Sequence, residues 1–447
     1  MNQKLCLLAL LSATLTACGG SSSGDGDDNG GGTPPPPPPQ TTLALQTLNT
    51  SQCGVESAAA GVEVLVHRTD GSVISSARTG SDGRLDLVWP DGAAHLTVAG
   101  ERVAEDGSRG PDIRTQVAWN SGDPGTFRFT NLASTAGCQC TEVTLDGNDV
   151  LAQFSGLTLH VTTRTANRIS TRQLSGSDSF TLCGTEAEWA PVDLVLRSDF
   201  GEAYAAELTA DFLAEPYQRL DPALFMGAEN RGELVSLAVN DNYSYSYSFA
   251  ETERGRRHYA YATPFEPVYY FPGLHEHNLV QAYEFLDLGA VAEGSVSYLR
   301  ANRDRVRDGA VSLTLPTSQN AFFDEALRVL VGMTEGSDVS GYDFRGIGEG
   351  RNLLTVTLAD RNGQARWTVD APLSGTLPAL ELPDAYLQQF EGMAAPELTI
   401  NSYGYHQALD TDSYRRRVRE LAEQGGVRSD FYDRYVYEML IVTLNGL

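Results

Sequence analysis

The sequence predicts a mainly β fold, in which tandem antiparallel β-sandwiches precede a β-rich C-terminal domain with a few short helices. Between residues 61 and 100, short stretches of alternating apolar residues are separated by aspartate–glycine turns. Turns about ten residues apart are typical of antiparallel sandwiches. The alternation returns at residues 156–182. Residues 231–447 carry more such stretches, together with two helical ones at 321–331 and 413–424.

Residues 1–17 have the parts of an export signal. Lys4 precedes an apolar stretch over residues 5–15, which is too short to span a bilayer. Leu15-Thr16-Ala17-Cys18 then resembles the lipobox of bacterial lipoproteins. The resemblance implies cleavage before Cys18, acylation of Cys18 with palmitate or a similar chain, and a membrane anchor. Gly19 is not the aspartate that retains such proteins at the inner membrane, so the resemblance implies the outer membrane of the cell envelope. The alternative is an ordinary secretion signal with a chance cysteine.

The lipidated cysteine and a disordered tether are expected to occupy residues 18–45. Gly19–Gly32 contains no apolar residue to bury, and Pro34–Pro39 favours a polyproline II rod. Such a tether would hold a folded body away from the lipid surface.

Composition excludes several classes of partner and cofactor. The formal net charge is −26, which repels nucleic acid, so we expect no nucleic-acid partner. Lys4 is the only lysine. The folded part therefore has no lysine for a phosphate-binding loop, a Schiff base or a serine–lysine pair. We predict no cofactor.

The first sandwich is predicted over residues 46–135, with strands near 62–66, 73–79, 84–88, 95–99, 113–119 and 127–129. Gly61-Val62-Glu63-Val64, Thr79 with Asp82-Gly83, and Leu85-Asp86-Leu87 resemble the carboxypeptidase regulatory-like, transthyretin-like Ig-fold family. The resemblance implies an Ig-like module that is accessory or adhesive and not a catalyst.

A second Ig-like sandwich is predicted over residues 136–230. Residues 156–161 align without a gap on residues 61–66, and the alternation stays in phase through residues 180–182. The two segments are 95 positions apart, counted from Gly61 to Gly156, which is the size of one Ig-like domain.

Four cysteines accompany the two sandwiches: Cys53, Cys138, Cys140 and Cys183. An exported chain favours disulfides, and four cysteines allow three connectivities. A Cys138–Cys140 bond would close a strained ring. Pairing Cys53 with Cys138 and Cys140 with Cys183 would give each sandwich its own disulfide. Metal binding is the rival, but the single Cys-x-Cys has no second close ligand pair.

Tyrosines alternate with serines early in the C-terminal domain, predicted over residues 231–447. After a turn at Arg254-Gly255-Arg256 the aromatic residues return on a second strand. The aromatic side could be a platform on which sugar rings stack, or it could be a sandwich core with its serine side in water. We favour the core. The candidate ligand-binding aromatics are Tyr243, Tyr245, Tyr247, Tyr259 and Tyr261.

His275-Glu276-His277 would place two imidazoles on one face of a strand, a spacing found in metal sites. The alternative is a polar loop that follows Phe271-Pro272-Gly273. We favour the loop, so no metal is predicted, and His275 and His277 remain weak candidates.

No catalytic residue is predicted. The leading hypothesis is a non-catalytic, lipid-anchored envelope protein that presents β-sandwich modules for adhesion or for binding a carbohydrate or protein ligand. One alternative is a secreted glycan-active enzyme with a carboxylate pair in residues 231–447, because such pairs leave no sequence motif. The other is a structural or assembly factor of an envelope complex.

Overall fold

The computed structural model describes residues 41–444, apart from 121, 166–167, 186–188, 200, 210–214, 254, 292–293, 335–338, 362–364, 392, 394–395 and 425–428. The signal, Cys18 and the tether up to residue 40 lie outside these residues. Residues 42–45, which were assigned to the disordered tether, belong instead to the first strand, where Leu43 and Leu45 are buried. The fold is mainly β, as predicted, with tandem Ig-like sandwiches, a β-rich C-terminal domain and four short α-helices in the described residues. None of the described helices has the length and apolar character needed to cross a bilayer.

Two facing sheets form the first sandwich, and all six expected strands are present. One sheet contains β1 (Thr42–Thr50), β2 (Glu56–Ala58), β5 (Arg84–Val88) and β8 (Gly122–Thr130). Facing it are β3 (Glu63–Arg68), β4 (Val73–Arg78), β6 (Ala93–Val103) and β7 (Arg109–Gln116). Val64, Leu96 and Phe129 are buried between them. Gly83 sits at the turn before β5 with φ +74°, where a Cβ would lie 2.3 Å from the Thr47 carbonyl oxygen.

The second sandwich repeats the connections of the first. Its larger sheet contains β10 (Thr158–Thr165), β11 (Arg168–Leu174), β13 (Val192–Arg197) and β14 (Ala203–Leu208). The smaller contains β9 (Gln139–Asp146), β12 (Ser177–Gly184) and β15 (Tyr217–Arg219), and α1 (Asn148–Gln153) follows β9. The orders β4-β3-β6-β7 and β11-β10-β13-β14 correspond. So do the smaller sheets, in which β8 and β15 are the parallel strands. The sequence alignment therefore reflects a common topology.

Both disulfides have the pairing that we preferred from the sequence. Cys53, just after β1, is bonded to Cys138, just before β9. Cys140 of β9 is bonded to Cys183, its cross-strand partner in β12. The first disulfide therefore ties the two sandwiches together, and the second lies within one sheet of the second sandwich. The expectation that each sandwich has its own disulfide is wrong.

A twelve-stranded sheet joins the C-terminal half to the first sandwich. Its order is β19-β18-β21-β22-β29-β28-β25-β26-β7-β6-β3-β4. The C-terminal strands in it are β18 (Tyr245–Thr252), β19 (Gly255–Ala262), β21 (Asn278–Val291), β22 (Gly294–Arg305), β25 (Leu353–Asp360), β26 (Arg366–Ala371), β28 (Pro396–Gly404) and β29 (Tyr435–Leu444). The junction is a parallel pairing of β26 with β7, from Asp112 opposite Arg366 to Gln116 opposite Asp370. The sheet thus contains strands of both the predicted first sandwich and the predicted C-terminal domain. The boundaries of the domains along the chain stay predictions.

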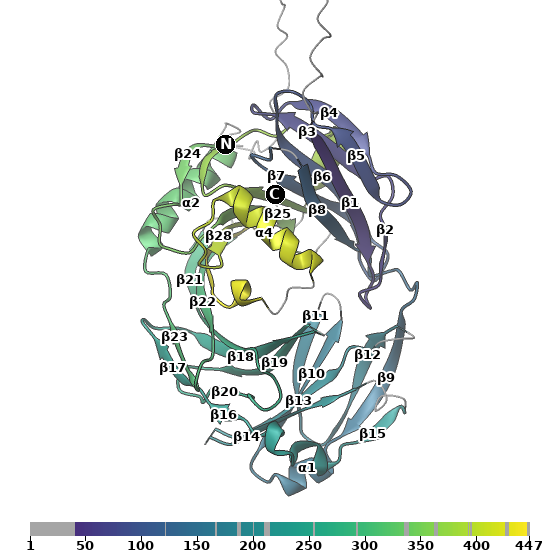
Figure 1. The fold of residues 1–447 in the computed structure, drawn as a ribbon, viewed down its shortest axis with the longest axis vertical. Helices are drawn as coiled ribbons and strands as arrows, with labels where there is room; N and C mark the ends of the chain where they lie inside the picture. The colour runs from purple at the N-terminus through teal and green to yellow at the C-terminus, as the bar shows by residue number, and fades with distance from the viewer. Residues whose placement is uncertain are drawn as a thin grey trace, which may run out of the picture.

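Helices cover both faces of this sheet. α2 (Gln319–Thr334) contains the helix expected at 321–331 and packs on one face through Phe322 and Val329. α4 (Thr411–Glu423) lies on the other face, close to β8 (Figure 1). Its cap is Asp410, whose side chain accepts a hydrogen bond from the Ser413 amide. α3 (Asp384–Glu391) was not expected.

Short strands and 3-10 turns complete the fold. They are β16 (Glu233–Leu234), β17 (Ser236–Val239), β20 (Tyr269–Tyr270), β23 (Ala310–Leu313), β24 (Val339–Asp343), β27 (Ser374–Leu377), η2 (Pro222–Phe225), η3 (Ala228–Asn230) and η4 (Asp430–Tyr432). In Figure 1 the two sandwiches and the C-terminal strands form a ring of β-structure, and α4 and η4 lie toward its middle.

Candidate functional site

The serine side of β18 is buried, so the favoured interpretation, a core with its serine side in water, is wrong. On the aromatic side Tyr245 is exposed and Phe249 is buried. Ser246 and Ser248 are 0% exposed, whereas Tyr245 is 45% and Tyr261 of β19 is 51% exposed. The serines lie beside Ala282 and Val280 of β21. The same apolar cluster includes side chains from β17 and β23. A layer of covering strands therefore reaches the small side chains and leaves the rings outside.

Three of the five candidate aromatics share the open face, and two do not. Tyr247 is half-buried between Tyr261, with ring centroids 5.5 Å apart, and Tyr283, at 6.3 Å. Tyr243 packs against the cluster under β18. Tyr259 is 5% exposed and lies 4.5 Å from the ring of Phe271. It is on the other side because the β18–β19 pairing shifts register after Ser248.

The row continues over neighbouring strands, whose tyrosines are partly buried and were missed by the sequence analysis. Tyr245 pairs with Tyr283 of β21, which pairs with Ala301 of β22. The row continues through Tyr437 of β29 to Tyr403 of β28. Period-two alternation in β21 and β29 could have shown Tyr283 and Tyr437, but only the strand pairing places them in one row. We call Tyr245, Tyr247, Tyr261, Tyr283 and Tyr437 the tyrosine face.

The tyrosine face is electrically neutral. Burial raises the pKa of Tyr247 and Tyr283, so these phenols stay protonated at neutral pH. Arg303 lies in the next row of this side, but it is only 5% exposed. It donates to the Tyr432 carbonyl oxygen at 2.6 Å and lies 5.2 Å from the ring of Tyr435. Arg256 lies beside these rings and is 34% exposed, but its charge is paired with that of Glu251. Flat rings with hydroxyl edges suit a neutral ligand that has both apolar and hydroxyl surfaces.

A pocket of about 620 Å³ adjoins the row at Tyr403. It lies between the first sandwich and the C-terminal domain, with walls from β1, β8 and α4. Trp119 lines it, is 9% exposed, and has no hydrogen-bond partner for its indole nitrogen within the described residues. Arg415 donates to the carbonyl oxygens of Val117 at 3.0 Å and Asp370 at 2.9 Å.

Charges in this pocket balance. The side chain of Asp370 accepts hydrogen bonds from Gln116 at 2.9 Å and Thr355 at 2.7 Å. The lining carries four carboxylates and four guanidinium groups: Asp86, Asp123, Asp370 and Glu423 with Arg84, Arg128, Arg415 and Arg419. A tryptophan, tyrosines and balanced charges can bind a polar ligand of small net charge.

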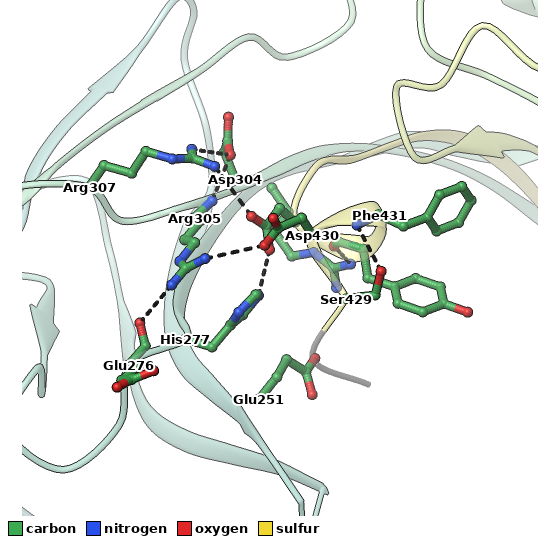
Figure 2. A network of polar contacts seen from close by, with 12 residues as sticks. Glu251, Glu276, His277, Asp304, Arg305, Arg307, Ser429, Asp430 and Phe431 are labelled. Carbon is green, nitrogen blue, oxygen red and sulfur yellow. Dashed lines mark hydrogen bonds and ion pairs between the residues drawn. The ribbon is translucent and has the colours of Figure 1, made fainter. Parts of the chain in front are cut away.

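The two candidate histidines do not share a site. Both lie in the loop before β21, as favoured from the sequence. His275 stacks on Tyr259, with centroids 6.3 Å apart. His277 is buried and its Nε2 atom lies 2.5 Å from Oδ1 of Asp433, near Asp430 (Figure 2). Cys53, Cys138 and Cys140 are also close together, and the disulfides account for their proximity.

No family model matches the chain, and no curated protein matches it. Among solved structures, a single B repeat unit of the collagen-binding surface protein of Staphylococcus aureus gives a TM-score of 0.13 at 11% identity, over 39% of this chain and 88% of that one. The Bacillus anthracis TIE protein gives 0.14 at 9% identity, over 62% and 50%. The pilus adhesin SpaC of Lactobacillus rhamnosus GG gives 0.13 at 9%, over 62% and 44%. The chain thus spans half or less of the last two, and these TM-scores show no common arrangement of the whole chain.

Proposed function

We propose that this protein is a non-catalytic, lipid-anchored envelope protein that binds a neutral polysaccharide on its tyrosine face. The observation that carries the proposal is the inverted burial of β18, where small serines are covered and large tyrosines are left open. Large exposed rings cost solvation free energy unless a ligand covers them. Leaving them outside while burying hydroxyls is the opposite of what stability alone favours.

Carbohydrate is the ligand class that best complements this surface. Sugar rings offer apolar C–H faces for stacking and hydroxyls at their edges, which match tyrosine rings and phenols. The row from Tyr245 to Tyr403 crosses five strands. Strands are about 4.8 Å apart, so the row spans roughly 19 Å. That length fits a chain of several sugar units better than one small molecule.

The anchor and tether support presentation of this face away from a membrane. The lipobox-like motif at Cys18 and the proline-rich segment up to residue 40 precede β1, which begins at Thr42. We place the protein in the cell envelope, at the outer membrane. Replacing Cys18 with alanine should move the protein from the membrane fraction to the soluble fraction. A variant that stays membrane-bound would contradict the anchor.

A binding panel tests the ligand class. The full chain, purified in detergent, is mixed with insoluble neutral glucans, with anionic polysaccharides and with fibrous proteins such as collagen, and the bound fraction is measured. We expect retention by at least one neutral polysaccharide and little by the anionic ones, which the net charge of −26 repels. Retention by protein fibres alone would replace carbohydrate with a protein ligand. Release of reducing sugar during incubation would show an enzyme instead.

A further inference from the structure

A second group of polar side chains lies at the junction of η4 with the loop before β21 (Figure 2). His277 immediately precedes β21, and Asp430 and Asp433 begin and follow η4. His277 is 8% and Asp433 2% exposed. The Asp430 side chain is 85% exposed. We propose that these three residues, called the His277 cluster below, bind one divalent cation of the zinc class.

The ligand atoms are already close to a coordinating arrangement. One ligand atom from each residue lies within 4.8 Å of the other two. Zinc–nitrogen and zinc–oxygen bonds of about 2.1 Å place tetrahedral ligands about 3.4 Å apart. The Nε2 atom of His277 and the Oδ1 atom of Asp433 are 2.5 Å apart. If these two atoms moved about 1 Å further apart, an ion would fit between them.

These two buried atoms lack hydrogen-bond geometry. Neither His277 Nε2 nor Asp433 Oδ1 has a hydrogen-bond partner within the described residues, although they face each other. Buried polar atoms are normally satisfied, and those that are not need an explanation such as an ion. A cation between these atoms would be bound by a lone pair of His277 Nε2 and by a lone pair of Asp433 Oδ1.

Arginines contact both carboxylates of the His277 cluster. Arg307 contacts Oδ2 of Asp433 at 3.3 Å, which leaves Oδ1 toward His277. Arg305 contacts one oxygen of Asp430 at 3.4 Å and donates to the Glu276 carbonyl oxygen at 3.2 Å. Such contacts orient metal ligands from behind.

The charges around the His277 cluster balance. Five carboxylates stand against five guanidinium groups: Glu251, Glu276, Asp304, Asp430 and Asp433 with Arg256, Arg303, Arg305, Arg307 and Arg434. The whole chain carries a net charge of −26, which adds a field that attracts cations.

The donor set selects the class of metal. Calcium and magnesium prefer oxygen ligands alone, whereas one imidazole and two carboxylates suit zinc and its neighbours. The exposed side of Asp430 leaves a position for water. A bound ion would fix η4, whose Phe431 packs against Tyr405 and against Tyr414 of α4. Metal binding should therefore also stabilise α4, which forms one wall of the pocket beside Tyr403.

Zinc titration of the full chain tests this inference. The protein is expressed without a histidine tag, stripped with a chelator and titrated with zinc chloride by calorimetry, and its metal content is measured after dialysis. We expect about one zinc per chain and a higher melting temperature. His277→Ala should abolish both effects. His275→Ala is the matched control, since His275 stacks on Tyr259 and should leave uptake unchanged.

Because Asp430 is exposed, replacing it should not disturb the packing of the core. Asp430→Asn should weaken zinc binding by tenfold or more while circular dichroism and the melting temperature of the metal-free protein stay unchanged. Cobalt added in place of zinc should give visible absorption in the wild type and not in His277→Ala. Absence of zinc uptake by the wild type, or equal uptake by wild type, His277→Ala and Asp430→Asn, would overturn the proposal. None of these results depends on polysaccharide binding.

Discussion

Glu438 is a buried charge with three side-chain partners. Its side chain is 0% exposed, forms an ion pair with Arg351, which is 1% exposed, and accepts hydrogen bonds from Tyr298 at 2.5 Å and Ser318 at 3.1 Å. With no lysine after Lys4, arginine makes such pairs throughout the folded body. Its several N–H donors allow a buried carboxylate to be shared with tyrosine and serine.

Glu438→Ala should lower the free energy of unfolding by about 3–5 kcal/mol, because Arg351 would be left buried without its counter-ion. Urea unfolding measures this change. The control is Glu420→Ala, whose ion pair with Arg417 lies at the surface of α4, with both side chains 44% exposed. That variant should change stability by less than about 1 kcal/mol. Equal effects of the two substitutions would contradict the assigned role of the buried pair.

Asp193 links stability to pH. Burial raises its pKa to about 6, although Arg164 at 2.8 Å and Arg257 at 3.4 Å oppose the shift. A raised pKa means that the folded state binds the proton more tightly than the unfolded state. The contribution of Asp193 is therefore complete below about pH 4 and is lost as the pH rises through about 6.

Urea unfolding between pH 4 and pH 7 tests this linkage. Between pH 4 and pH 7 the free energy of unfolding should fall further in the wild type than in a variant that lacks the Asp193 carboxylate. Asp193→Asn should flatten this part of the profile. If both proteins had the same slope, Asp193 would not titrate in the window.

At the scale of elements, local chemistry predicted the strands but not what covers them. Aspartate–glycine turns such as Asp82-Gly83 are set by neighbouring residues, so β3 to β5 were found correctly. The exposure of β18 depends on β17 and β23, and β23 lies about 60 residues further along the chain. Alternation shows that a strand has two different sides, but it does not show which side meets the core.

The junction of β7 with β26 was also beyond sequence reasoning, since it joins Gln116 to Asp370. Behind it, Leu65 and Ile113 of the first sandwich pack with Leu382 and Phe390 of the C-terminal half. Paired strands with a shared apolar cluster should unfold as one unit.

Phe390→Ala tests this coupling. The side chain is 3% exposed, and its truncation should cost about 3–5 kcal/mol. Hydrogen exchange should rise together in peptides from β3 and from β25. Faster exchange in β25 alone would show that the first sandwich is an independent module.

At the scale of the whole molecule, the sequence predicted the mainly β fold, two related sandwiches and the disulfide pairing. It missed the twelve-stranded sheet and the pocket, because both arise from pairing between distant segments. In the candidate site too, spacing along the chain could be predicted and pairing between distant strands could not. Tyr245, Tyr247 and Tyr261 were found from their spacing, whereas Tyr283 and Tyr437 joined them only through the register of β21 and β29.

Polysaccharide affinity of matched tyrosine variants decides whether the tyrosine face binds the ligand. Tyr245 and Tyr283 have ring centroids 5.6 Å apart. The double variant Tyr245→Ser/Tyr283→Ser should bind at least about tenfold more weakly, a loss of about 1.4 kcal/mol. The control, Tyr217→Ser, removes a ring that is 55% exposed on the second sandwich and should bind as the wild type does. Undiminished binding by the double variant, or an equal loss in the control, would show that the ligand binds elsewhere.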